Sequence, residues 1–183
     1  MSTAAIQERL ITADEFERIA HRYGRSELID GRIIQMSPTK RQHGKVENRV
    51  AWLITQHVNT HALGEVGTGE VGCKLPNGRV RAPDVLFVPK DRLVDVPEDA
   101  FWPFAPNLAV EVISQGEKRQ KVRDKVNEWI AAGSDLVWVV DPQSCTVTVY
   151  ERAVPPCVLG EGDTLEGGAV LPGFSCSVAE IFG

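Results

Sequence analysis

The sequence has few cysteines and no long apolar segment. Its four cysteines, Cys73, Cys145, Cys157 and Cys176, form no C-x-x-C pair, so no structural zinc site is expected, and disulfides are not expected without a secretion signal. The polar segment 1–9 does not resemble a signal peptide. No apolar run approaches the ~18 residues of a membrane span. We therefore expect a cytoplasmic protein without a membrane segment.

The sequence also lacks an excess of positive charge. Its net charge of −5 argues against broad, non-specific binding to nucleic acid. Basic residues are nevertheless gathered in two places, residues 40–45 and residues 118–125. Such a run is either a local phosphate-binding patch or the solvated face of a helix, and the composition alone leaves both interpretations open.

The N-terminal part predicts a helix followed by a hairpin. Thr12 and Glu15 have the spacing of a capping box, in which both side chains satisfy free backbone amides at the start of a helix. Apolar residues then recur at helical spacing, and Gly24 is expected to end the helix. The pair Asp30 and Gly31 lies between two apolar runs, which is a strong short-range signal for a β-hairpin.

The middle of the chain predicts a second helix and three strands. The helix is expected over about residues 43–61, where apolar side chains share one face. Strands are expected over residues 66–74 and 79–88, with a turn at the Pro-Asn-Gly sequence between them. The run 108–113 is apolar apart from one acid, as expected of a strand that is buried on both faces.

The C-terminal part adds a third helix and two more strands. The helix is expected over about residues 117–132, a buried strand over 136–140 and an edge strand over 146–150. Helices and strands in this order predict an α/β fold, a mixed central sheet flanked by helices. The length is suited to a single domain over residues 1–183, with a core over about 12–182.

Two acids interrupt apolar strands of this predicted sheet. Glu111 lies within the run 108–113, and Asp84 follows Pro83 at the start of another apolar strand. Burial of an ionised carboxylate costs at least several kcal/mol unless a cation compensates it. Each acid alone could belong to a buried ion pair or accept hydrogen bonds. Two of them on consecutive strands indicate hard oxygen ligands for Mg²⁺ or Mn²⁺.

The chain resembles a known nuclease superfamily in these residues. Pro83-Asp84 followed by Glu111 matches the first two parts of the PD-(D/E)XK pattern. More specifically, the chain resembles the Uma-type restriction endonuclease family over about residues 12–182. The resemblance implies a restriction-endonuclease-like fold and a metal-dependent nuclease. The matching segments are Glu27-Leu28-Ile29-Asp30-Gly31, His43, Val80-Arg81-Ala82-Pro83-Asp84-Val85, Leu108-Ala109-Val110-Glu111-Val112-Ile113-Ser114, Lys125, Trp129, Ala132-Gly133, Val137-Trp138-Val139-Val140-Asp141-Pro142 and Leu171-Pro172-Gly173-Phe174.

The sequence departs from the superfamily pattern at the lysine. That pattern places a lysine two residues after the acid, where this chain has Ile113. The resemblance implies that Lys125, on the following helix, takes its place. The strand rises ~10 Å beyond Glu111 and the helix returns ~12 Å to Lys125, which brings the two side chains to about the same level. Lys121 and Lys118 are the alternatives, and Lys125 could also be a surface lysine.

Further site residues follow from the resemblance. It implies that Glu27 helps to hold the metal or its waters. From the sequence alone, Glu27 could equally be an exposed residue of the strand. The backbone carbonyl of Val112 is expected to join Asp84 and Glu111 as a metal ligand. His43 is a candidate for contact with a phosphate or with the attacking water, or it is an ordinary polar residue in the first turn of a helix.

The combined hypothesis is metal-dependent hydrolysis of phosphodiester bonds, with DNA as the substrate. Lys121, Arg119 and Arg123 are expected to hold backbone phosphates. A homodimer is compatible with cleavage of both strands. Two alternatives stay open: a nuclease-like module that binds nucleic acid or protein without cutting it, and an unrelated metal hydrolase of small phosphoesters.

Overall fold

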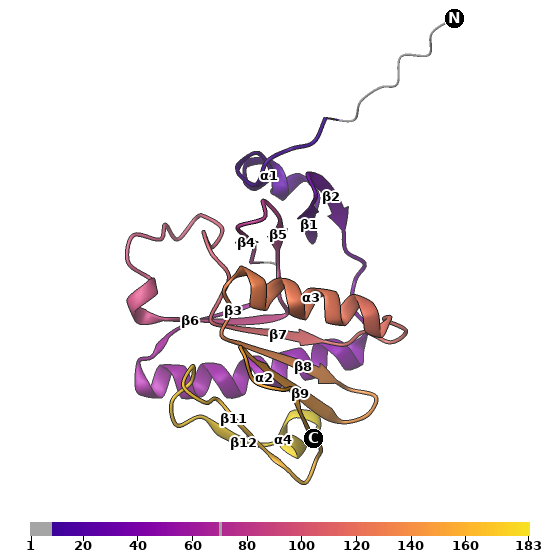
Figure 1. Ribbon diagram of the computed structural model, residues 1–183, viewed down its shortest axis with the longest axis vertical. Coiled ribbons are helices and arrows are strands. Elements are labelled where there is room, and N and C mark those ends of the chain that lie inside the picture. The colour runs from indigo at the N-terminus through magenta and orange to yellow at the C-terminus, as the bar shows by residue number, and fades with distance from the viewer. Residues whose placement is uncertain (1–8, 70) are drawn as a thin grey trace, which may run out of the picture.

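A six-stranded mixed sheet forms the centre of the computed structural model, which describes residues 9–69 and 71–183 (Figure 1). The strand order is β10-β9-β8-β7-β6-β3. β7 and β8 are parallel, and the other neighbouring pairs are antiparallel. This confirms the predicted α/β fold with a mixed sheet. The strands are β3 Gly64–Thr68, β6 Val85–Pro89, β7 Leu108–Val112, β8 Leu136–Asp141, β9 Thr146–Glu151 and β10 Cys157–Leu159.

Helices cover both faces of this sheet (Figure 1). α2 (Arg41–His61) and α4 (Val178–Phe182) pack on one face, and α3 (Arg119–Ala132) packs on the other. Side chains alternate along β7, so Val110 and Val112 join the core beneath α2 and Ala109 joins the core beneath α3. Glu111 therefore faces α3.

A smaller sheet lies on the α3 side of the main sheet (Figure 1). It has the order β2-β1-β5-β4, and α1 packs against it through Phe16, which shares a small core with Leu28 and Val80. The predicted Thr12–Glu15 capping box is present at the start of α1. The elements are α1 Ala13–Ile19, a 3₁₀ turn Ala20–Arg22, β1 Ser26–Ile29, β2 Arg32–Gln35, β4 Cys73–Lys74 and β5 Val80–Arg81.

The predicted hairpin forms between β1 and β2. Asp30 and Gly31 have φ values of 50° and 74°, the left-handed conformation that a two-residue hairpin turn requires. Gly31 also packs closely: a Cβ there would lie 2.7 Å from Cβ of Leu10. The glycine is therefore required by both the turn and the packing.

The two strands predicted over 66–74 and 79–88 differ from the structure, because each is broken in two. Their outer parts, β3 and β6, pair in the main sheet, and their inner parts, β4 and β5, pair in the small sheet. The second break falls at Ala82–Asp84, where Pro83 has no amide to donate to a ladder. Asp84 consequently lies where the chain passes from one sheet to the other.

The C-terminal region also differs from the prediction. The strand over 146–150 was expected at the sheet edge, but β10 pairs with it and forms the edge. The two-stranded sheet of β11 (Thr164–Glu166) and β12 (Ser175–Ser177), the 3₁₀ turn Lys90–Arg92 and α4 were not predicted. Among the described residues, no helix is both long enough and apolar enough to span a membrane.

Candidate active site

Asp84 lies directly before β6, and Glu111 lies on the neighbouring strand β7, on its α3 side. β6 and β7 pair with Val85 opposite Val110, so Asp84 lies beside the part of β7 that contains Glu111. The Asp84 amide donates to the Val110 carbonyl at 3.0 Å, which holds Asp84 against β7. Both acids are buried, with 4% and 5% of their surface exposed. The strand pairing therefore brings the two predicted acids together.

Two side chains of α3 bind the Glu111 carboxylate. Nζ of Lys125 lies 2.7 Å from Oε2, and the indole nitrogen of Trp129 donates to Oε1 at 2.8 Å. Burial raises the pKa of Glu111 despite the opposing charge of Lys125, and the charge of Asp84 adds to this rise. The two acids thus repel each other, and a further cation beside them would relieve that repulsion.

The Glu111 carboxylate has the opposite effect on Lys125. Burial alone would lower the pKa of Lys125, but the charge and hydrogen bond of Glu111, together with the charges of Glu27 and Glu117, outweigh burial and raise it. Lys125 is therefore an ammonium group at neutral pH. Its side chain is only 13% exposed, which excludes the interpretation of Lys125 as a freely solvated surface lysine.

Asp84 is held by three donors. Oδ2 accepts the Val112 amide at 2.7 Å and lies 3.3 Å from Nε2 of His43, and Oδ1 accepts Nη2 of Arg25 at 2.8 Å. Burial would raise the pKa of Asp84, but His43 outweighs burial and lowers it. Asp84 is thus ionised at neutral pH, and its orientation is fixed from the β7 backbone.

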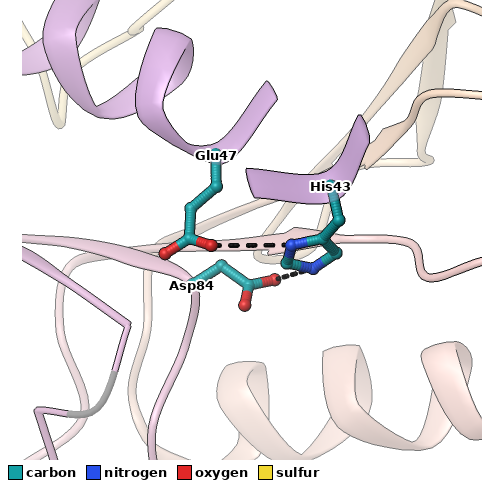
Figure 2. Close-up of side chains that lie close together, drawn as sticks. All are labelled: His43, Glu47 and Asp84. Carbon is teal, nitrogen blue, oxygen red and sulfur yellow. Dashed lines mark ion pairs between the residues drawn. The ribbon is translucent and has the colours of Figure 1, made fainter. Parts of the chain in front are cut away.

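His43 lies between Asp84 and a third acid, Glu47, one turn along α2 (Figure 2). Nδ1 of His43 is 3.5 Å from Oε2 of Glu47 and makes no hydrogen bond with any described residue. Burial would lower the pKa of His43, but the two carboxylates outweigh burial and raise it to about 9. One ligand atom from each of these three residues lies within 4.8 Å of the others. Glu47 was not predicted, and its i, i+4 spacing from His43 was the available signal.

A cleft of about 670 Å³ opens beside these acids. Asp84, His43 and Lys125 line the cleft. Glu111 does not line it and is buried behind Lys125, to which it is bound. The other walls come from the connection between β2 and α2 and from the loop between β7 and α3. Substrate in this cleft would meet Asp84 and Lys125 directly.

The other predicted basic residues divide between this cleft and a neighbouring one. Lys118 and Lys121 line the first cleft, and Lys121 is 58% exposed. Arg119 and Arg123 line an adjoining cleft of about 610 Å³ that passes over β8 and β9 and contains Tyr150. The two clefts share the loop between β7 and α3 as a wall.

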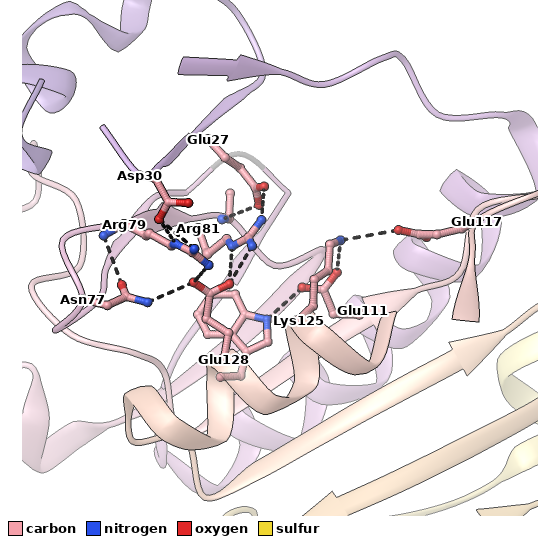
Figure 3. A network of polar contacts seen from close by, with 11 residues as sticks. Glu27, Asp30, Asn77, Arg79, Arg81, Glu111, Glu117, Lys125 and Glu128 are labelled. Carbon is pink, nitrogen blue, oxygen red and sulfur yellow. Dashed lines mark hydrogen bonds and ion pairs between the residues drawn. The ribbon is translucent and has the colours of Figure 1, made fainter. Parts of the chain in front are cut away.

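Glu27 is buried, but its carboxylate already has partners. Oε2 lies 2.7 Å from Nη1 of Arg81, and Oε1 accepts the Ala82 amide at 3.4 Å (Figure 3). Burial of Glu27 excludes the interpretation as an exposed strand residue. Its side chain belongs to an ion-pair network between the small sheet and α3.

Comparisons with known proteins identify the family and the fold of the chain. The sequence model of the Uma2 family, described as "Putative restriction endonuclease", matches residues 13–179. The chain belongs to the Uma2 family. No curated protein matches the sequence. A crystal structure of "a putative nuclease belonging to DUF820 from Anabaena variabilis ATCC 29413" matches with a TM-score of 0.78 and 21% identity, over 94% of this chain and 97% of that chain. The family and the shared fold support a nuclease.

The acids of this Uma2 protein are a suitable donor set for a hard divalent cation. Buried carboxylate oxygens are the ligands that Mg²⁺ and Mn²⁺ prefer, and burial opposes the charge of Glu111 in the absence of such an ion. Nδ1 of His43, buried without a hydrogen bond to any described residue, could serve as a further ligand once it has lost its proton. Asp84 is common to both possible sets, one with Glu111 and one with His43 and Glu47.

Proposed function

We propose that this Uma2 protein is a metal-dependent endonuclease that hydrolyses phosphodiester bonds in DNA. The observation that carries the proposal is the pair of buried acids, Asp84 directly before β6 and Glu111 on the adjacent β7, with Lys125 bound to Glu111. Asp84, Glu111 and the backbone carbonyl of Val112 would hold Mg²⁺ or Mn²⁺. When bound, such an ion polarises the scissile phosphate and lowers the pKa of a water.

Lys125 would act as a fixed positive charge in this reaction. Its raised pKa keeps the ammonium protonated, so it is suited to orienting the attacking water and stabilising negative charge rather than to accepting a proton. The Val112 amide fixes the position of the Asp84 carboxylate, and a bound ion would take the place of Arg25 or His43 beside it. His43 lines the cleft beside Asp84 and would contact a phosphate or the attacking water.

The basic residues indicate how DNA would lie. Lys118 and Lys121 would bind phosphates within the first cleft, and Arg119 and Arg123 would bind the backbone where it continues into the adjoining cleft. The predicted contribution of Glu27 to the metal or its waters stays a prediction. A cytoplasmic location and a homodimer, which supplies two sites for two strands, belong to the same proposal.

One observation favours a non-catalytic alternative. The chain's own cations, Lys125, Arg25 and His43, already neutralise the two acids. A nuclease-like module that only binds nucleic acid or protein would need no metal ion to neutralise these acids. Such a module would show no Mn²⁺ affinity at Asp84.

The test combines metal binding with DNA cleavage. Mn²⁺ titration by calorimetry and conversion of supercoiled plasmid would be measured for wild type, Asp84→Asn, Glu111→Gln and the control Asp124→Asn. Asp124 is an exposed acid on α3. Loss of cleavage in the first two variants with a wild-type control is expected, and retained metal-dependent cleavage in both would overturn the proposal.

The same experiment separates the two donor sets and the alternative function. Glu47→Gln, added to the series, weakens Mn²⁺ binding if His43 and Glu47 hold the ion with Asp84, and leaves it unchanged if Glu111 does. Absence of both Mn²⁺ binding and cleavage in wild type would favour the non-catalytic module.

A further inference from the structure

Arg81 lies at the joint between the small sheet and α3. It is on β5, three residues before Asp84, and its side chain is 13% exposed. Nη1 lies 2.7 Å from Glu27 on β1, and Nη2 lies 2.6 Å from Glu128 on α3 (Figure 3). Nε donates to the same Glu128 oxygen at 2.7 Å. One guanidinium group therefore joins two carboxylates, 5% and 8% exposed, from two separate elements.

Glu128 is on the same side of α3 as the lysine of the site. It follows Lys125 by three residues and precedes Trp129, so all three lie within one turn of the helix. Lys125 and Trp129 contact Glu111, and Glu128 contacts Arg81 (Figure 3). Besides the apolar packing of α3, two polar contacts thus fix its rotation about its axis, one with the main sheet and one with the small sheet.

The second contact is costly to break. Loss of Arg81 would leave Glu27 and Glu128 buried, with only Arg79 and Asn77 still bound to Glu128. An uncompensated buried acid is strongly destabilising, so nearby elements would move until water or another cation reached it. Glu128 lies on the part of α3 that contains Lys125, so a displacement of Glu128 would displace Lys125.

We propose that Arg81 is a positioning residue of the active site: by binding Glu128 it holds α3 in the rotation that brings Lys125 onto Glu111. Arg81 is not among the residues that line the catalytic cleft, so it acts through Lys125 and not on substrate. The catalytic consequence rests on the proposed nuclease function, whereas the placement of Lys125 does not.

The electrostatics of the network agree with this placement. Burial opposes protonation of Lys125 and Glu111 favours it most, and the charge of Glu27 contributes in the same direction. Glu27 is therefore close enough to Lys125 for its charge to be felt, with Arg81 bound to it. The charges of Glu27 and Lys125 therefore interact, which links the ion-pair network to the lysine.

The first test is non-additivity in cleavage. Arg81→Gln, Lys125→Met and the double variant would be compared with wild type, with Arg79→Gln as a matched control. Arg79 also binds Glu128, but through one nitrogen and from a side chain that is 28% exposed, and without it Arg81 still joins Glu128 to Glu27. We expect Arg81→Gln to lower kcat about 10- to 100-fold, with KM unchanged. Arg81→Gln should have no further effect in the Lys125→Met background, and Arg79→Gln should stay near wild type.

The second test does not use activity. The rate at which a lysine-specific acylating reagent modifies Lys125 in metal-free protein would be followed by peptide mass spectrometry, with the exposed Lys121 as the internal reference. Arg81→Gln should accelerate modification of Lys125 several-fold relative to Lys121. Arg79→Gln should not, and Arg81→Lys should restore most of the protection.

Equal losses from Arg81→Gln with and without Lys125, or unchanged reactivity of Lys125, would overturn the proposal. If wild type cleaves no DNA, the acylation result still decides the placement and the failure belongs to the nuclease function alone. If Arg81→Gln does not fold, Glu128→Gln removes the charge on α3 that both Arg81 and Arg79 bind, and an effect on Lys125 larger than that of Arg79→Gln supports the proposal, whereas an equal effect overturns it.

Discussion

The ammonium nitrogen of Lys125 lies 2.7 Å from the Glu111 carboxylate, although one residue is on a helix and the other is on a strand. Position 113, directly after β7, where the nuclease pattern has a lysine, holds Ile113. α3 turns back along the sheet after the loop and returns a lysine to the level of the acid. The positive charge that the proposed chemistry requires is therefore supplied from a separate element, and its position depends on how that helix packs.

Replacement of this lysine should separate catalysis from metal binding. We expect Lys125→Met to reduce metal-dependent cleavage by about 100-fold or more, because a preorganised charge beside the reacting groups is lost. Mn²⁺ affinity should be retained or increase, since Lys125 no longer competes for the charge of Glu111. Initial cleavage rates and calorimetric titration measure the two effects.

Lys121→Met is the control for that variant. Lys121 is 58% exposed and lies 3.8 Å from Glu117 rather than beside Glu111. Its loss should weaken DNA binding modestly and leave kcat unchanged. A larger loss of kcat in Lys121→Met than in Lys125→Met would transfer the catalytic assignment to Lys121.

Two buried tryptophans allow a stability prediction. Trp129 donates its indole N–H to Glu111, whereas the indole N–H of Trp138 has no hydrogen-bond partner among the described residues. Both side chains are fully buried, so replacement by phenylalanine removes a similar volume. Trp129→Phe should lower the free energy of unfolding by about 1–3 kcal/mol more than Trp138→Phe, because a hydrogen bond to a charged group is lost.

Urea unfolding in EDTA measures that difference, with m-values compared to confirm a similar unfolding transition. The metal-free state is used because a bound cation would compensate the charge of Glu111 and so change the strength of its hydrogen bond with Trp129. An equal or greater loss in Trp138→Phe would mean that the Trp129–Glu111 hydrogen bond contributes no net stability.

The pairing of the two acids could be predicted from the sequence because local patterns determine it. Asp84 precedes one apolar strand and Glu111 interrupts the next, positions in which an acid is unfavourable, and strands consecutive in the sequence tend to be neighbours in a sheet. The family resemblance indicated Lys125, and the rises of a strand and of a helix agree with its position.

The contacts that could not be predicted depend on how separate elements pack. Glu47 is part of the site because the first turns of α2 approach Asp84, and nothing in the spacing of α2 specifies which strand it meets. Arg81 binds Glu128 because the small sheet leans on α3. The strands predicted over 66–74 and 79–88 are divided for the same reason, because their two parts pair with partners in different sheets on either side of Pro83. Such contacts are set by tertiary packing.

His43 should make the stability of the metal-free protein depend on pH. Its folded pKa is raised to about 9 from an ordinary value of 6.5, so its interaction with Asp84 and Glu47 stabilises the folded state fully below pH 6.5. That contribution is lost as the pH rises through about 9. The stability difference between wild type and His43→Asn should therefore shrink from pH 6 to pH 10.

Urea unfolding in EDTA at several pH values measures this dependence. His21→Asn, at an exposed position, is the control and should show no such trend. A difference between wild type and His43→Asn that is constant across the range, or that grows with pH, would show that the histidine is not held as a cation between the two acids.

The path of DNA should be visible in the salt dependence of binding. Each side chain that neutralises a phosphate contributes roughly 0.9 to the slope of log K against log salt on duplex DNA. If Lys118 and Lys121 bind phosphates in the first cleft, their joint replacement by glutamine should reduce the slope by roughly 1.8. Replacement of Arg119 and Arg123 should have a similar effect if DNA continues into the adjoining cleft.

Fluorescence anisotropy with a labelled duplex in EDTA, which prevents metal-dependent cleavage, measures the slopes between about 50 and 200 mM salt. Arg152→Gln, an exposed position near Asp135 at the end of β9, should leave the slope unchanged. If the lysine pair lowers the slope and the arginine pair does not, DNA ends its contact at the loop between β7 and α3. If neither pair changes it, DNA does not cross this face.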